Sequence, residues 1–335
     1  AMWVPLHTVI RLVVTYNRLL RPVVRLPIDP CRNFIFLYSK QLPVPMSSAP
    51  LARFSATAVA ESPDWTGSQT ATVVLRHGEL AFEAGDERLS IPLESIFDIN
   101  TGSVPPLFDS LPGMGVTIAY DSGDERVVAA IGADESLVRK FVTAIFKTIL
   151  DNTLLEIKHP ATRGGRVTGA AFESALLSLS STAVTFDTDG STVGIEMEAV
   201  FGFSRTPQKI DGAKRPAIEV RHFADGTAIT TQVVADAPRT LSLLGRYLRR
   251  QYDERLARLQ QLSLSAPEIE TLVTIYSTRG TGLAARDVLE HPPDSVRKLL
   301  RSLQTDSLVR QGSGGPELTT TGQIVVTQYL QQVNE

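Results

Sequence analysis

The sequence predicts a multidomain protein of mainly β structure with added helices, in which one strand-rich unit occurs twice before a helical module. Three observations predict this fold class. The length of 335 residues suits two or three domains of roughly 100 residues each. Apolar residues recur in the same order at a shift of 104 residues, and after Leu262 the pattern changes to short helices.

The domain boundaries follow from these changes of pattern and from charge. We expect an extension at 1–48, a first repeated domain at 49–152, a second at 153–258 and a C-terminal domain at 259–335. Residues 1–45 hold six basic residues and one acid, a charge of +5, so the other 290 residues carry −8. Prolines interrupt any long helix there. We therefore interpret 1–48 as a non-native or disordered extension, with a basic amphipathic anchor as the alternative.

The repeat is defined by apolar positions that coincide without a gap at a shift of 104, and again at 102 after a two-residue slip. The first set pairs Leu75 with Leu179, Leu80 with Val184, Phe82 with Phe186, Ile91 with Ile195, Leu93 with Met197 and Phe97 with Phe201. The second pairs Val116 with Ile218, Ile118 with Val220, Val127 with Ile229, Phe141 with Leu243 and Ile145 with Tyr247. Chance could align some apolar residues of the two copies, but it would not reproduce the same order of expected strands and helix.

Each copy reads as antiparallel strands followed by one helix. Leu89, Ile91 and Leu93 recur at every second position, which is typical of strands with one buried face. Asp225 and Gly226 lie between alternating runs and supply the positive φ of a tight hairpin.

The closing helices have apolar residues at three- and four-residue spacing, around Phe141 in the first copy and Leu244 in the second. This layout, in about 100 residues, is that of the PH (pleckstrin homology) superfold, so we expect two tandem PH-like β-sandwich or barrel domains, each closed by a C-terminal helix. The hairpin loops lack the basic cluster of a phosphoinositide site, which disfavours lipid binding. Leu256 and Leu259 extend the second helix, which we expect to bridge domains or to form a homodimer.

The C-terminal segment predicts a winged helix-turn-helix domain. Ser265 and Glu268 form a capping box before a first helix, a short second helix is expected at 283–289, and a third follows Pro293. A two-stranded wing around a glycine-rich tip at 312–315 and a last helix complete the order.

The third helix of this domain exposes Arg297, Lys298 and Arg301, which suggests either protein docking or DNA contact. Residues 262–335 contain six basic and eight acidic residues, a charge of −2, whereas phosphate neutralisation dominates DNA affinity. We therefore favour protein docking. A DNA-binding transcriptional regulator is kept as the alternative function.

The sequence contains no motif that indicates catalysis, a cofactor or a metal. P-loop, nucleophile-elbow and zinc-protease patterns are absent, Cys31 is the single cysteine, and the five histidines are scattered along the chain. No stretch has the 18 or so apolar residues that span a bilayer. We expect a non-enzymatic cytoplasmic protein without membrane insertion.

One loop between the repeats combines two glycines with two arginines and is a candidate binding site. Gly164 and Gly165 lie between Arg163 and Arg166, so a tight backbone would carry two guanidinium groups close together. The functional interpretation is a docking site for a carboxylate or phosphoryl group. The alternative is an interdomain turn whose arginines pair with neighbouring acids.

Several strings make the chain similar to a known family. They are IPLESIFD at 91–98, GSVPP at 102–106, the helical stretch 141–150, KHP at 158–160 and GGRV at 164–167. On these the chain resembles the archaeal taxis proteins of the CheF family, from about Pro50 to near the C-terminus.

The resemblance implies an adaptor that receives the response regulator CheY, has CheC and CheD proteins among its partners, and contacts cytosolic components of the archaellum motor. It supplies no catalytic or binding residues. Our candidates for partner binding, Arg163, Arg166, Arg297, Lys298 and Arg301, rest instead on their local charge within an acidic chain.

Overall fold

The computed structural model describes residues 49–102, 111–210, 212–278, 292–312 and 314–333, all within one compact unit, Ser47–Glu335. The predicted extension at 1–48 and the predicted short helix at 283–289 lie outside the described residues, as do Ser103 to Pro106 of one family-like string.

The first sheet has seven antiparallel strands in the order β4-β3-β2-β1-β7-β6-β5. Its strands are β1 (Ala52–Ala60), β2 (Gln69–Leu75), β3 (Glu79–Ala84), β4 (Glu87–Pro92), β5 (Ile96–Thr101), β6 (Met114–Ser122) and β7 (Glu125–Ala133). The helix α2 (Glu135–Leu150) follows, and its first turn is capped by Asp134, whose carboxylate accepts from the backbone N–H groups of Ser136 and Leu137. Apolar side chains such as Phe141 and Ile145 are buried on one side of α2.

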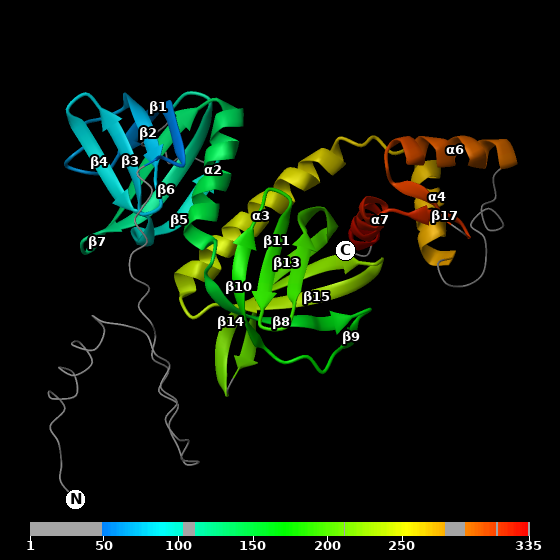
Figure 1. Ribbon diagram of the computed structural model, residues 1–335. Helices are drawn as coiled ribbons and strands as arrows, with labels where there is room; N and C mark the ends of the chain where they lie inside the picture. Colours follow the sequence, from blue (N-terminus) through cyan, green and yellow to red (C-terminus); the bar gives the residue numbers. More distant parts are fainter. Residues whose placement is uncertain (1–48, 103–110, 211, 279–291, 313, 334–335) are drawn as a thin grey trace, which may run out of the picture. The chain divides into compact units, whose positions relative to one another are not determined.

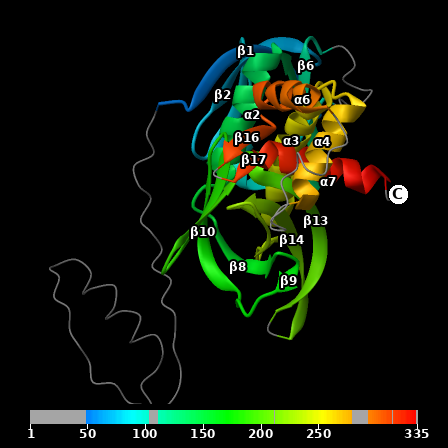
Figure 2. The ribbon, with the colours of Figure 1, turned by 90° about the vertical axis from the view of Figure 1, so that its right-hand side faces the viewer.

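The second sheet repeats this arrangement, with the order β12-β11-β10-β8-β15-β14-β13 and with β9 paired to β8. Its strands are β8 (Leu154–Arg163), β9 (Arg166–Val167), β10 (Glu173–Leu179), β11 (Ala183–Thr188), β12 (Thr192–Glu196), β13 (Val200–Ile210), β14 (Ala213–Ala224) and β15 (Thr227–Val234). The helix α3 (Pro238–Gln260) follows it. Figures 1 and 2 show the pronounced curvature of this sheet.

The two sheets share their strand order and their short 3-10 turns. These turns, η1 (Leu93–Ser95) and η3 (Met197–Ala199), lie 104 residues apart and follow β4 and β12. The duplicated order of elements that the sequence repeat predicts is therefore present.

Helix α3 contacts both sheets. Arg246 donates two hydrogen bonds to the carboxylate of Asp98 in β5, at 2.9 and 3.0 Å, and Arg239 donates to the carbonyl oxygens of Leu93 and Ile96. One hydrophobic core runs through both repeats without a break. Helix α3 thus bridges the two repeats through Arg239 and Arg246. The roles predicted for its extension at Leu256 and Leu259, a bridge between domains or a homodimer, stay predictions.

The C-terminal segment contains three described helices and a short hairpin. They are α4 (Ala266–Thr278), α6 (Pro293–Thr305), β16 (Val309–Gly312), β17 (Gly315–Leu318) and α7 (Thr320–Val333). The predicted capping box is present, because Glu268 accepts hydrogen bonds from the backbone N–H and the hydroxyl of Ser265 at 2.9 and 2.7 Å. Leu272, Leu303 and Val326 belong to its separate core.

The predicted class, mainly β with several antiparallel sheets and with helices, is confirmed. Assignment of the repeats to the PH-like fold and of the C-terminal segment to the winged-helix fold stays a prediction, as do the domain boundaries. Of the helices within the described ranges, none has the length and apolarity needed to cross a membrane.

Candidate functional site

The candidate arginines Arg163 and Arg166 lie at the two ends of a tight hairpin between β8 and β9. Gly164 and Gly165 form its two-residue turn, with φ of 56° and 79°. Such positive values at both central positions define the hairpin turn that glycine adopts without steric cost. Arg163 and Arg166 are consequently direct cross-strand partners.

The hairpin concentrates positive charge at the surface. Both arginines are exposed, and neither forms an ion pair with an acid in the part of the chain that the structure describes. Like charges directly opposite each other in a β-ladder are destabilising. The adjacent Val167 is also 79% exposed. Two guanidinium groups in this position can bind a carboxylate or a phosphoryl group through paired N–H donors.

Beside this hairpin lies a polar cluster that sequence reasoning missed. The hydroxyl of Thr231 is 2.7 Å from Nδ1 of His159 and 3.1 Å from Nε2 of His222. The two imidazole rings are stacked with centroids 5.9 Å apart. The histidines are 63 residues apart in the chain, so only the pairing of β8, β14 and β15 brings them together.

Burial determines the charge state of this cluster. His222 is 2% exposed, and its burial, with a smaller contribution from His159, lowers its pKa from 6.5 to about 4. Burial also lowers the pKa of His159. Both rings are therefore neutral at pH 7, and each can share a hydrogen bond with Thr231 in the appropriate tautomer.

The low pKa of His222 predicts a loss of stability in acid. Between pH 6.5 and 4 the unfolded chain binds a proton at this position and the folded chain does not, so stability is full above pH 6.5 and falls as the pH drops to 4. We expect this residue to contribute a loss of about 2 kcal/mol between pH 7 and pH 5. Urea unfolding at both pH values measures it.

The control for this prediction is the exposed His77. Between pH 7 and pH 5, the variant His222→Gln should lose about 2 kcal/mol less of its free energy of unfolding than the parent does. The variant His77→Gln keeps His222 in place, so it should lose as much as the parent. An equal pH dependence in all three proteins would show that His222 is not the responsible group.

The other three candidates lie together on α6. Arg297, Lys298 and Arg301 are exposed there, as predicted. Arg297 forms an ion pair with Asp294 at 3.2 Å, and Arg310 in the β16–β17 hairpin forms one with Glu317 at 3.2 Å. Acids thus neutralise part of this charge. No ion pair or hydrogen bond among the described residues links the α6 group to the arginine hairpin.

Comparison with known proteins gives the following matches. A family model described as Archaeal Chemotaxis signal transduction system protein F matches residues 52–254. Taxis protein CheF2 of Halobacterium salinarum is 33% identical over 289 residues, which cover 86% of this chain and all of that protein. Taxis protein CheF1 of the same organism is 27% identical over 139 residues, 41% of this chain and 47% of that protein.

A solved structure, the Inner Membrane Complex Sub-compartment Protein 3 of Toxoplasma gondii, also matches. It has a TM-score of 0.23 and 8% identity, and the match covers 31% of this chain and 76% of that one. Similarity at this level supports no conclusion about fold or function.

Proposed function

This chain belongs to the archaeal CheF family of chemotaxis signal transduction proteins, and on that premise we propose that it is a non-enzymatic adaptor in archaeal taxis. A role in taxis follows from the family. The proposal adds that the chain links the response regulator CheY, with CheC and CheD proteins, to cytosolic components of the archaellum motor, and that it does so in the cytoplasm through protein contacts alone.

Within this proposal, the observation that matters most is the hairpin of Arg163 and Arg166. Two exposed cations held face to face by a rigid turn gain stabilisation when an anionic group of a partner lies between them. The cations of α6 supply a second charged surface on a separate element. An adaptor needs such separate surfaces, because it has to hold two partners at once.

The groups with strongly shifted pKa values have structural roles, which supports a non-enzymatic function. His222 is hydrogen bonded to Thr231, the Tyr247 hydroxyl donates to the carbonyl oxygen of Ser180, and Arg255 donates to that of Val200 at 2.8 Å. Burial causes each of these shifts. Such groups stabilise the fold and are not arranged for proton transfer to a substrate.

The alternative of a DNA-binding regulator is not supported by the family or by the matched proteins. The ion pairs of Arg297 and Arg310 also reduce the charge available for phosphate contacts. We therefore interpret the α6 surface as a protein-docking surface.

The test is calorimetric titration of the full chain with CheY from the same organism, with and without beryllofluoride as a phosphoryl mimic. We expect binding that is tighter with the mimic. If the chain prefers the phosphorylated state of CheY, the mimic raises the population of that state and so raises the affinity. The double variant Arg163→Glu/Arg166→Glu should weaken it at least about tenfold, since loss of one charge-assisted contact corresponds to roughly that factor.

Lys209 and Lys214 provide a matched control. They are exposed cross-strand partners near the end of the β13–β14 hairpin, so Lys209→Glu/Lys214→Glu makes the same change of charge at another hairpin. The affinity of this control variant for CheY should equal that of the parent. No binding of CheY in either state would remove the adaptor proposal, and equal losses in both double variants would remove the specific role of Arg163 and Arg166.

A further inference from the structure

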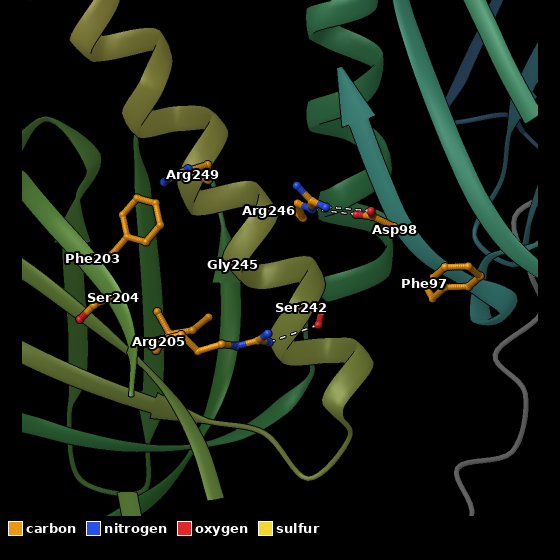
Figure 3. A pocket seen from close by; sticks show the side chains of 10 residues that line it. Phe97, Asp98, Phe203, Ser204, Arg205, Ser242, Gly245, Arg246 and Arg249 are labelled. Carbon is orange, nitrogen blue, oxygen red and sulfur yellow. Dashed lines mark hydrogen bonds and ion pairs between the residues drawn. The ribbon is translucent and has the colours of Figure 1, made fainter. Parts of the chain in front are cut away.

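A cleft of about 570 Å³ lies between the two repeats, with α3 as its floor. Phe97 and Asp98 of β5 line one side, and Phe203 and Arg205 of β13 line the other. Arg246 and Arg249 rise from α3 between them (Figure 3). β5 and β13 are equivalent edge strands of the two sheets, so the duplication itself produces a groove with two similar walls.

The cleft is positively charged, although the whole chain carries −3. Three arginines line it, against the single acid Asp98. Asp98 is engaged by Arg246 through both carboxylate oxygens, at 2.9 and 3.0 Å. A concave surface lined by one sign of charge attracts ligands of the opposite sign.

The other two arginines retain most of their donors. Arg205 donates to the neutral hydroxyl of Ser242 at 3.2 Å, and Arg249 lies 3.7 Å from the exposed carboxylate of Asp253. The guanidinium of Arg249 is also placed over the ring of Phe203, 5.5 Å from its centroid. A cation–π contact fixes the position of a guanidinium without using its N–H groups, so this arginine is preorganised for an anion.

The chemistry of the cleft combines these cations with apolar surface. Phe97 and Phe203 are half-buried on opposite walls, and the side chain of Arg249 is 61% exposed. The cleft is open to solvent, so a bound chain can enter and leave it. This arrangement matches a bound chain whose carboxylates contact Arg205 and Arg249 and whose apolar residue lies between the rings of Phe97 and Phe203.

We propose that this cleft binds an acidic segment of a protein partner, with two Asp or Glu carboxylates held by Arg205 and Arg249. This inference rests on the proposed function, since it assumes that the chain works through protein contacts. It assigns to the groove between the repeats a role separate from that of the Arg163 and Arg166 hairpin.

Fluorescence anisotropy of a dye-labelled hexaglutamate peptide with the full chain tests the proposal. We expect saturable binding, and we expect Arg205→Glu/Arg249→Glu to weaken it about tenfold or more, because two charge-assisted contacts are replaced by repulsion. The control Lys209→Glu/Lys214→Glu makes the same change of charge on β13 and its neighbour β14, outside the cleft, and should bind as the parent does. Matching thermal unfolding curves show that the variants are folded.

Three results would overturn the proposal. They are absence of peptide binding, equal weakening by the cleft and control variants, and displacement of the peptide by inorganic phosphate at a lower concentration than by free hexaglutamate. The last would identify a phosphate site instead. If CheY binds the chain but the peptide does not, the adaptor function stands and the cleft proposal fails. If the peptide binds but CheY does not, the cleft proposal stands and the adaptor function fails.

Discussion

Replacement of Tyr247 by alanine is expected to lower the free energy of unfolding by roughly 3–5 kcal/mol, the usual cost of truncating a large buried aromatic side chain. Tyr247 in α3 is completely buried. Its ring packs edge to face against Phe146 of α2, with centroids 5.8 Å apart, and its hydroxyl donates to the carbonyl oxygen of Ser180 between β10 and β11. One side chain thus joins both closing helices to the second sheet.

Urea unfolding of three variants separates the contributions. Burial raises the pKa of Tyr247 to about 12, so its hydroxyl remains protonated and keeps donating. Tyr247→Phe should therefore cost about 1–3 kcal/mol, because the Ser180 carbonyl loses its partner. Tyr276 in α4 is 38% exposed, and Tyr276→Ala should cost much less than Tyr247→Ala. Similar losses for Tyr247→Ala and Tyr276→Ala would contradict the role assigned to Tyr247.

The second large effect is expected at Gly322 in α7. A Cβ atom added there would overlap the backbone carbonyl of Leu308, far inside van der Waals contact. That carbonyl accepts from the backbone N–H of Thr319 at 3.0 Å, and the Thr319 hydroxyl accepts from the N–H of Gly322 at 3.1 Å. Gly322→Ala should therefore destabilise the C-terminal helices by about 3 kcal/mol, as overpacking in a rigid site does.

Gly245 in α3 offers the matched control, because it is also a helical glycine. A Cβ atom there would lie 3.5 Å from the side chain of Ile218, an ordinary contact. Gly245→Ala should then stabilise the protein by up to about 1 kcal/mol through higher helix propensity. Hydrogen exchange that is faster in α4, α6 and α7 for Gly322→Ala alone is the expected result, and stabilisation by both substitutions would show that the close approach at Gly322 is absent.

Much of the fold could be predicted because local chemistry determines it. The alternation around Leu89 and Ile91 specifies a strand with one buried side, and the pairing of Ser265 with Glu268 specifies where α4 begins. Gly164 and Gly165 specify the tight turn that sets Arg163 opposite Arg166. In each case the deciding interactions lie within a few residues of one another.

The clusters that sequence reasoning missed are made by contacts between distant segments. His159 and His222 meet because β8 and β14 both pair with β15, and Arg246 meets Asp98 from 148 residues away. Neither pairing leaves a spacing that could be recognised in the chain. Arg246 and Arg249 lie three residues apart in α3, a spacing that occurs on any exposed helix surface.

The sequence by itself determined the duplication, the order of strands and closing helices, the arginine hairpin and the family, because turn preferences and apolar periodicity act over short distances and are repeated in both copies. Only the tertiary structure decided that α3 bridges the repeats, that two histidines share one hydroxyl, and that a positively charged cleft separates β5 from β13. The histidine pair depends on strand pairing within the second sheet, and the bridge and the cleft depend on how the two repeats pack around one continuous core, so no local pattern in the sequence specifies them.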